Sequence, residues 1–158
     1  MSFETTKIET ADKNKFYQLL AQQAQGLLQV EKDFIANCAN LSALLYHSLE
    51  QVNWVGFYLL QSDQLVLGPF QGQVACTRIP LGQGVCGTAF SENKTQKVAD
   101  VNAFKGHIAC DSASASELVV PLNGLGVLDI DSPILNRFDA EDQRGCEIIA
   151  DIFLKSLI

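Results

Sequence analysis

Residues 117–131 of the chain read ELVVPLNGLGVLDID and contain the pattern that decides the fold. Two apolar runs, LVVPL and LGVLDID, flank the dipeptide Asn123-Gly124. This dipeptide favours the tight turn of a β-hairpin, because both of its residues tolerate a positive φ angle. We therefore expect two antiparallel strands joined at Asn123-Gly124.

The second run alternates acidic and apolar residues. Asp129 and Asp131 project from one face of the expected strand, roughly 7 Å apart, while Leu128 and Ile130 face the other side. A solvent-exposed face would explain this pattern. If the face instead lines a pocket, crowded negative charge raises at least one pKa and keeps a proton available near neutral pH. The same charge would attract an ammonium group.

The register of the hairpin decides where Glu117 lies. A two-residue loop pairs Leu122 with Leu125 and turns Glu117 away from the aspartates. A three-residue loop with a bulge pairs Leu122 with Gly126 and brings Glu117 across from Asp131. We expect the bulged form, because it places the acidic side chains on one face.

Helical and strand-like patterns surround this hairpin. Apolar residues recur at helical spacing in two segments within residues 1–50, and a further helix is expected over 138–157 with Asp139 as its cap. Residues 53–132 carry the expected sheet, whose first runs are 53–60, 64–70 and 75–81. This order predicts an α+β fold, in which an antiparallel sheet packs the N- and C-terminal helices on one face.

Length and composition are those of one globular domain spanning residues 1–158. The chain has 47% hydrophobic and 18% charged residues, and no apolar run is long enough to cross a bilayer. Its net charge of -7 would repel nucleic acids and anionic membrane surfaces, so neither partner is expected. The N-terminal stretch lacks the basic and apolar regions of a secretion signal, so we expect a cytoplasmic protein.

The chain has five cysteines in no repeating framework. An odd number without such a framework argues against a structural disulfide scaffold, and favours thiols that are buried, reactive or metal-bound. Cys38 and Cys146 lie on or beside apolar helical stripes, where cysteine usually acts as a small hydrophobe. We expect these two to be structural.

The other three cysteines lie close together in the middle of the chain. Cys110 is in a long irregular connection beside His107, whose imidazole could assist a thiolate. Cys76 and Cys86 flank the turn at residues 80–84, so either could form a disulfide with an oxidised Cys110. Thiols beside carboxylic acids suggest redox chemistry, but spacing alone does not choose between the two partners.

Two other kinds of site use the same residues. A zinc ion could take Cys76, Cys86, His107 and Cys110 as ligands, but structural zinc sites usually draw their ligands from close pairs, and only the last two are near in sequence. The string GQGVCG at 82–87 satisfies GxGxxG, yet it lies in mid-chain without the βαβ context of a dinucleotide site. We expect neither, and read the string as a tight turn.

Several segments make the chain recognisable, namely NWVGFYLL, LVLGPFQGQVACTRIPLGQGVCGTAF, HIACDSASASELVVPL, GVLDIDSP and NRFDAEDQ. Together they resemble the free methionine-(R)-sulfoxide reductases, which are built on a GAF domain. The resemblance covers nearly the whole chain from about Trp54 to Asp142. ACDSAS and the paired aspartates of LDID are more specific than a GAF fold alone.

The resemblance implies a role for each central thiol. Cys110 matches the nucleophile that attacks the sulfoxide sulfur and becomes a sulfenic acid. Cys76 matches the resolving thiol, which would form a Cys76–Cys110 disulfide, and Cys86 matches an alternative or auxiliary one. Thioredoxin is then the implied external reductant, with no bound cofactor and no metal.

The resemblance also implies the substrate site. Glu117, Asp129 and Asp131 match the acids that hold the sulfoxide oxygen and the substrate ammonium, with Glu117 and Asp131 close to the chemistry. Trp54 and Tyr58 match an aromatic box around the terminal methyl group. From the residues alone these two share a strand face and could wall a pocket, although core packing is the commoner role.

The competing interpretation is a non-catalytic GAF sensor that binds a small ligand. Three convergent thiols would be surplus to mere binding, so we favour the enzyme. The two N-terminal helices could also supply the surface of a homodimer.

Overall fold

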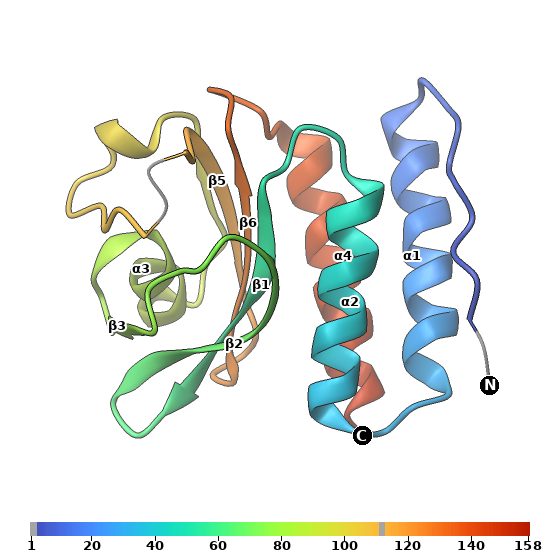
Figure 1. The fold of residues 1–158 in the computed structure, drawn as a ribbon, viewed down its shortest axis with the longest axis horizontal. Helices are drawn as coiled ribbons and strands as arrows, with labels where there is room; N and C mark the ends of the chain where they lie inside the picture. Colours follow the sequence, from blue (N-terminus) through green and yellow to red (C-terminus); the bar gives the residue numbers. More distant parts are fainter. Residues whose placement is uncertain (1–2, 111–112) are drawn as a thin grey trace.

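A computed structural model describes residues 3–110 and 113–158 (Figure 1). Within these residues the sheet has the strands β1 (Trp54–Gln61), β2 (Gln64–Gly72), β3 (Arg78–Pro80), β4 (Gln96–Val98), β5 (Ser116–Pro121) and β6 (Gly126–Ser132). The helices are α1 (Lys13–Gln29), α2 (Phe34–Ser48), α3 (Gly84–Glu92), the short 3-10 helix η1 (Val101–Ala103) and α4 (Ala140–Ser156). None of the described helices is long and apolar enough to span a membrane.

The sheet is antiparallel throughout its described pairs, in the order β3-β2-β1-β6-β5-β4. Helices α2 and α4 cover one face, and α1 packs outside them, mainly against α4 (Figure 1). The expected α+β fold with its terminal helices on one face is therefore confirmed. Helix α3 lies on the other face, over β5 and β6.

The β5–β6 hairpin adopts the bulged register. The backbone N–H of Leu122 donates to the carbonyl oxygen of Gly126 at 2.9 Å, and Glu117 pairs directly with Asp131. The two turn residues that follow Leu122 have φ angles of 49° and 84°, which the dipeptide Asn123-Gly124 tolerates. The predicted three-residue loop is confirmed.

The two faces of the sheet bury different kinds of side chain. Because strand residues alternate, every second residue of β1, β5 and β6 enters the apolar core beneath the helices. That core includes Val55, Phe57, Leu118, Leu128, Ile130 and, from α4, Phe153. Cys38 and Cys146 are buried in the same core as free thiols, as expected. The intervening strand residues point to the opposite face, where the sequence places its acids and aromatics.

Helix α4 begins after Asp139, as predicted. The Asp139 side chain accepts hydrogen bonds from the backbone N–H groups of Glu141 and Asp142, and the Asp142 carboxylate completes a capping box. Asp142 is buried and also binds Lys13 at 2.8 Å and the hydroxyl of Tyr17 at 2.6 Å. This carboxylate therefore ties α1 to the start of α4.

One strand is shorter than expected. The run at 75–81 forms a strand only at Arg78–Pro80. Its first residues instead leave the sheet edge and carry Cys76 over the face opposite the terminal helices, where that residue meets the irregular connection before β5. The contact of Cys76 with the connection before β5 therefore outweighs the strand preference of the residues that precede Arg78.

Candidate active site

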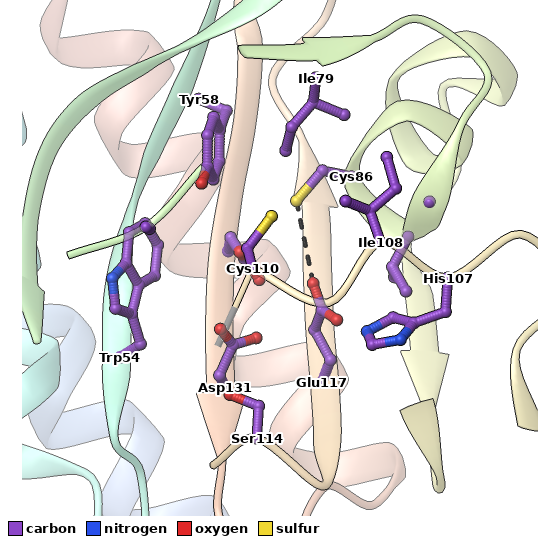
Figure 2. Close-up of a pocket in the computed structure, with 14 residues that line it drawn as sticks. Trp54, Tyr58, Ile79, Cys86, His107, Ile108, Cys110, Ser114, Glu117 and Asp131 are labelled. Atoms are coloured by element: carbon purple, nitrogen blue, oxygen red, sulfur yellow. Dashed lines mark hydrogen bonds between the residues drawn. The ribbon is translucent and has the colours of Figure 1, made fainter. Parts of the chain in front are cut away.

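A pocket lies on the sheet face opposite the terminal helices, between the strands, α3 and the connection before β5 (Figure 2). Its lining includes every site residue predicted from the sequence except Cys76: Trp54 and Tyr58 from β1, Cys86 from α3, Cys110 from the connection, Glu117 from β5, and Asp129 and Asp131 from β6. Cys76 joins the site through a covalent bond. Tertiary folding thus brings all eight residues to one place.

Cys76 and Cys110 form a disulfide, with their Cα atoms 5.1 Å apart and 34 positions apart in sequence. This is the pairing that the family resemblance implies. Since both sulfurs are bonded to each other, neither is a thiolate ligand in this state, and the Cys3His zinc site considered above is not formed. Asp111 and Ser112, which follow Cys110 in the ACDSAS motif, lie outside the described residues.

The three acids are buried together. Glu117 and Asp131 are direct cross-strand partners, and Asp129 lies two residues from Asp131 on the same face. The exposed fraction of the residue surface is 8% for Glu117, 9% for Asp131 and 4% for Asp129. Burial, together with the negative charge of Asp131, raises the pKa of Glu117 to about 8. Burial and the charge of Glu117 raise the pKa of Asp129 well above its ordinary value. The solvent-exposed alternative for this face is therefore wrong, and protonated acids are available near neutral pH.

Cys86 is buried against these acids. Its Sγ donates a hydrogen bond to Oε1 of Glu117 at 3.8 Å (Figure 2). Burial, followed by the charges of Asp129 and Glu117, raises the pKa of the Cys86 thiol well above its usual value. Cys86 is consequently a neutral thiol at physiological pH, whereas attack on a disulfide or sulfenic acid requires a thiolate.

Stacked aromatic rings form one wall of the pocket. The Trp54 ring stacks on Tyr58 with centroids 5.8 Å apart and on Phe70 at 5.2 Å. The indole N–H of Trp54 donates to the Gln73 carbonyl at 3.1 Å, and the Tyr58 hydroxyl donates to the Cys76 carbonyl at 2.8 Å. The aromatic pair therefore also holds the segment that carries Cys76.

Phe70 was not singled out from the sequence. It pairs with Gly56 across β1 and β2, and a side chain at Gly56 would overlap the Cβ of Phe70. A glycine inside an otherwise aromatic and β-branched strand was the available signal, because it marks a place where a large neighbour needs room.

His107 and the glycine-rich turn complete the surroundings. His107 lines the pocket beside Ile108, as expected for a residue near Cys110 (Figure 2). The GQGVCG string forms the turn into α3, where Gly82 and Gly84 have φ angles of 76° and 64°. Strands β3 and β4 on either side of α3 lie at opposite edges of an antiparallel sheet, so the βαβ unit of a dinucleotide site is absent from the described residues.

Comparison with known proteins identifies relatives along nearly the full chain. No protein-family model matches. The free methionine-R-sulfoxide reductase of Escherichia coli is 54% identical over 138 residues, which cover 85% of this chain and 84% of that protein. The crystal structure of the free methionine-R-sulfoxide reductase of Neisseria meningitidis in complex with its substrate has a TM-score of 0.92 at 44% identity, covering 97% of this chain and 95% of the other. A solved GAF domain structure has a TM-score of 0.89 at 40% identity, covering 94% and 91%. The chain therefore belongs to the free methionine-R-sulfoxide reductase family, with the GAF fold.

Proposed function

We propose that the chain reduces free L-methionine-(R)-sulfoxide to L-methionine by thiol chemistry. The observation that carries this proposal is the disulfide between Cys76 and Cys110 beside a pocket of buried acids. The names of the relatives specify the substrate class and the epimer. A pure binding module would not need a disulfide-forming pair at its ligand site.

In the first step the reduced Cys110 sulfur attacks the sulfur of the sulfoxide. The sulfoxide oxygen passes to Cys110 as a sulfenic acid, methionine leaves, and two electrons move from the cysteine to the substrate sulfur. An acid must protonate that oxygen as its bond to the substrate breaks. Glu117 fits this role, because it lines the pocket and its pKa of about 8 keeps it protonated at neutral pH.

In the second step Cys76 attacks the sulfenic acid. A sulfur–sulfur bond forms, the hydroxyl group leaves, and water is the product. Thioredoxin, acting as an external dithiol, then reduces the disulfide by thiol exchange and restores both thiols. The structure corresponds to the oxidised end of this cycle.

The substrate would be held by its charge at one end and its methyl group at the other. Asp129 and Asp131 supply the negative charge for the ammonium group, and Trp54 and Tyr58 supply an apolar wall for the methyl. With the disulfide closed the cavity has a volume of about 30 Å³, against ~300–1,000 Å³ for typical ligand pockets. We therefore expect the reduced chain, free of the Cys76–Cys110 bond, to be the form that admits an amino acid.

A single-turnover assay separates the roles of the thiols. The reduced chain is mixed with free methionine sulfoxide and the methionine formed is quantified, without and then with thioredoxin, its reductase and NADPH. Cys110→Ser should form no methionine in either assay. Cys76→Ser should form one equivalent but fail to cycle, while Cys38→Ala, far from the pocket, should behave as wild type.

The opposite assignment has a distinct signature. If Cys76→Ser eliminated the first turnover while Cys110→Ser preserved it, the two roles would be reversed. Intact ligand binding without consumption of the sulfoxide by the wild type would instead favour the sensor.

A further inference from the structure

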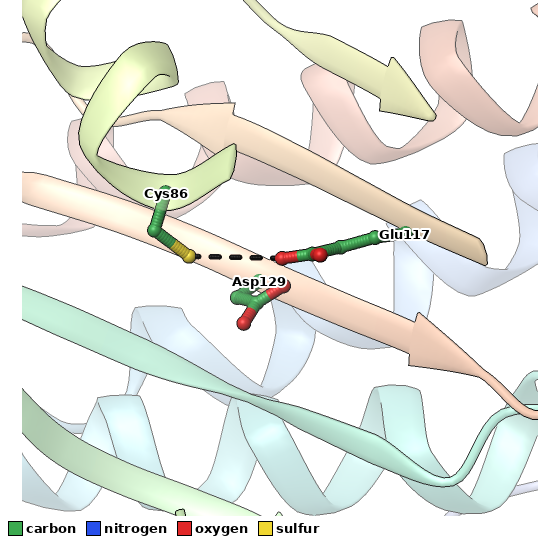
Figure 3. Close-up of side chains that lie close together, drawn as sticks. All are labelled: Cys86, Glu117 and Asp129. Carbon is green, nitrogen blue, oxygen red and sulfur yellow. Dashed lines mark hydrogen bonds between the residues drawn. The ribbon is translucent and has the colours of Figure 1, made fainter. Parts of the chain in front are cut away.

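Cys86, Glu117 and Asp129 converge in the pocket from three elements, α3, β5 and β6 (Figure 3). One potential ligand atom from each side chain lies within 4.8 Å of the other two. All three residues are buried, with 4%, 8% and 4% of their surface exposed. The Cys3His site considered from the sequence shares only Cys86 with this set.

The spacing fits a tetrahedral metal ion. Bonds of ~2.3 Å to sulfur and ~2.1 Å to oxygen at the tetrahedral angle separate the sulfur and oxygen ligands by about 3.6 Å. The observed distance between Cys86 Sγ and Glu117 Oε1 is 3.8 Å. The two pairs that involve Asp129 are within 4.8 Å. The sulfur–oxygen pair with Cys86 needs a shift of at most about 1.2 Å to reach ~3.6 Å, and the oxygen–oxygen pair with Glu117 needs at most about 1.4 Å to reach ~3.4 Å.

A second observation points to a positively charged ligand. Oδ1 of Asp129, a residue that lines the pocket, is buried without a hydrogen-bond partner among the described residues. The side chains that interact with this carboxyl group are those of Glu117, Asp131 and Cys86, two further acids and a thiol. The described lining contains no lysine or arginine that would balance the acids. A buried carboxylate oxygen without a partner costs free energy that a bound cation recovers.

We propose that Cys86, Glu117 and Asp129 form a binding site for one thiophilic divalent cation, with Zn²⁺ as the expected metal and water as its fourth ligand. A thiolate combined with carboxylates selects zinc or cobalt over magnesium, which prefers oxygen ligands alone. Binding transfers no electrons. The Cys86 thiol loses its proton as its sulfur bonds to the metal, and any proton carried by the two carboxylates is released as well.

The site does not depend on the redox state of the other two thiols. Cys76 and Cys110 are not ligands, so the oxidised chain should bind the metal with its disulfide intact. Because Glu117 and Asp129 are also assigned to the proposed reaction, the bound ion would block turnover and compete with the sulfoxide. The metal site itself does not rest on the proposed function.

Cobalt substitution tests the proposal with a spectroscopic readout. The full chain, with its Cys76–Cys110 disulfide confirmed by intact mass, is titrated with Co²⁺ alone. We expect one Co²⁺ per chain with a thiolate-to-cobalt charge-transfer band, which Zn²⁺ removes and Mg²⁺ does not. Cys86→Ser should lose the band, and Asp129→Asn should keep the band but bind at least about tenfold more weakly.

Asp63→Asn is the matched control, because it removes one exposed carboxylate from the β1–β2 turn and should change nothing. Near-ultraviolet circular dichroism checks that each variant is folded, and Cys86→Ala replaces Cys86→Ser if the serine variant is not. The proposal is overturned if the oxidised wild type shows no charge-transfer band, or if a folded Cys86 variant retains it. Turnover of the sulfoxide is measured separately, so a failure of the metal site and a failure of the proposed reaction give different results.

Discussion

Replacing Glu117 with glutamine tests whether this residue supplies the proton in the first step. Glutamine keeps the size of the side chain and its hydrogen-bonding capacity but cannot release a proton. Glu117 lines the pocket and is 8% exposed, so bulk water is a poor substitute for it. We expect the first turnover to slow by ~10²–10⁴-fold, the usual contribution of a positioned general acid, which corresponds to about 3–5 kcal/mol of transition-state stabilisation.

The pH dependence gives the sharper result. With the pKa of Glu117 at about 8, roughly nine-tenths of the side chains carry the proton at pH 7 and about one-tenth at pH 9. The protonated fraction of Glu117 therefore falls about tenfold between these pH values, and the single-turnover rate of the wild type should decline with it on the alkaline side, once the attacking thiol is fully ionised. Ionisation of the attacking thiol makes the single-turnover rate rise with pH. A decrease of this rate on the alkaline side therefore reports the loss of the proton from Glu117.

Single-turnover methionine formation is measured from pH 6 to about pH 10 with pre-reduced protein, which removes any contribution from thioredoxin. Glu117→Gln should lack the alkaline decline, and Glu92→Gln, at an exposed position on α3, should retain it. A Glu117→Gln protein with the wild-type rate and the same decline would refute Glu117 as the proton donor.

Further predictions concern substrate binding and stability. Trp54→Ala removes the ring stacked on Tyr58 and should raise KM about tenfold with a smaller change in kcat; a fall in kcat at unchanged KM would contradict this. Gly126→Ala places a Cβ against the Tyr58 carbonyl and should lower the free energy of unfolding by ~1–3 kcal/mol in urea titrations. An unchanged urea midpoint would contradict this prediction, because it would mean that β6 accommodates the added methyl group without loss of stability. Asp142→Asn removes the buried carboxylate that pairs with Arg137 and Lys13, of which Lys13 keeps Asp139 as a partner; it should cost ~3–5 kcal/mol in the same assay, which a loss below ~1 kcal/mol would refute. The folded state holds the Glu117 proton more tightly than the unfolded state, so stability should fall as pH rises from the ordinary glutamate pKa of 4.5 to about 8. Glu117→Gln should weaken this dependence, and the part that Asp129 contributes should remain.

The local elements were predictable because local chemistry decides them. Asn123-Gly124 accepts the positive φ angles that a tight turn requires, and Asp139 caps α4 with its own carboxylate. Helical periodicity located the terminal helices, and alternation placed Asp129 and Asp131 on one face of β6. Each of these signals depends on residues within a few positions of one another.

The burial of the acids was not predictable in the same way. An alternating strand looks the same whether its polar face meets water or a pocket, and the choice depends on α3 and the Cys110 connection covering that face. The pKa of Glu117 follows from this cover, because loss of solvent is its largest cause. The stacking of Phe70 on Trp54 likewise needs β2 paired beside β1.

The sequence by itself determined the terminal helices, the turn at Asn123-Gly124 and the alternation of β6, since turn preferences and side-chain periodicity act over short distances. It left two registers open for the hairpin, and the tertiary structure adopts the one that pairs Glu117 with Asp131. Only the tertiary structure decided that Cys86 meets Glu117 and Asp129 while Cys76 meets Cys110. Cys76 and Cys86 are 34 and 24 positions from Cys110, and this spacing does not indicate which of them pairs with it. Their partners differ because α3 buries one sulfur over the sheet, whereas the segment after β2 carries another to the connection before β5.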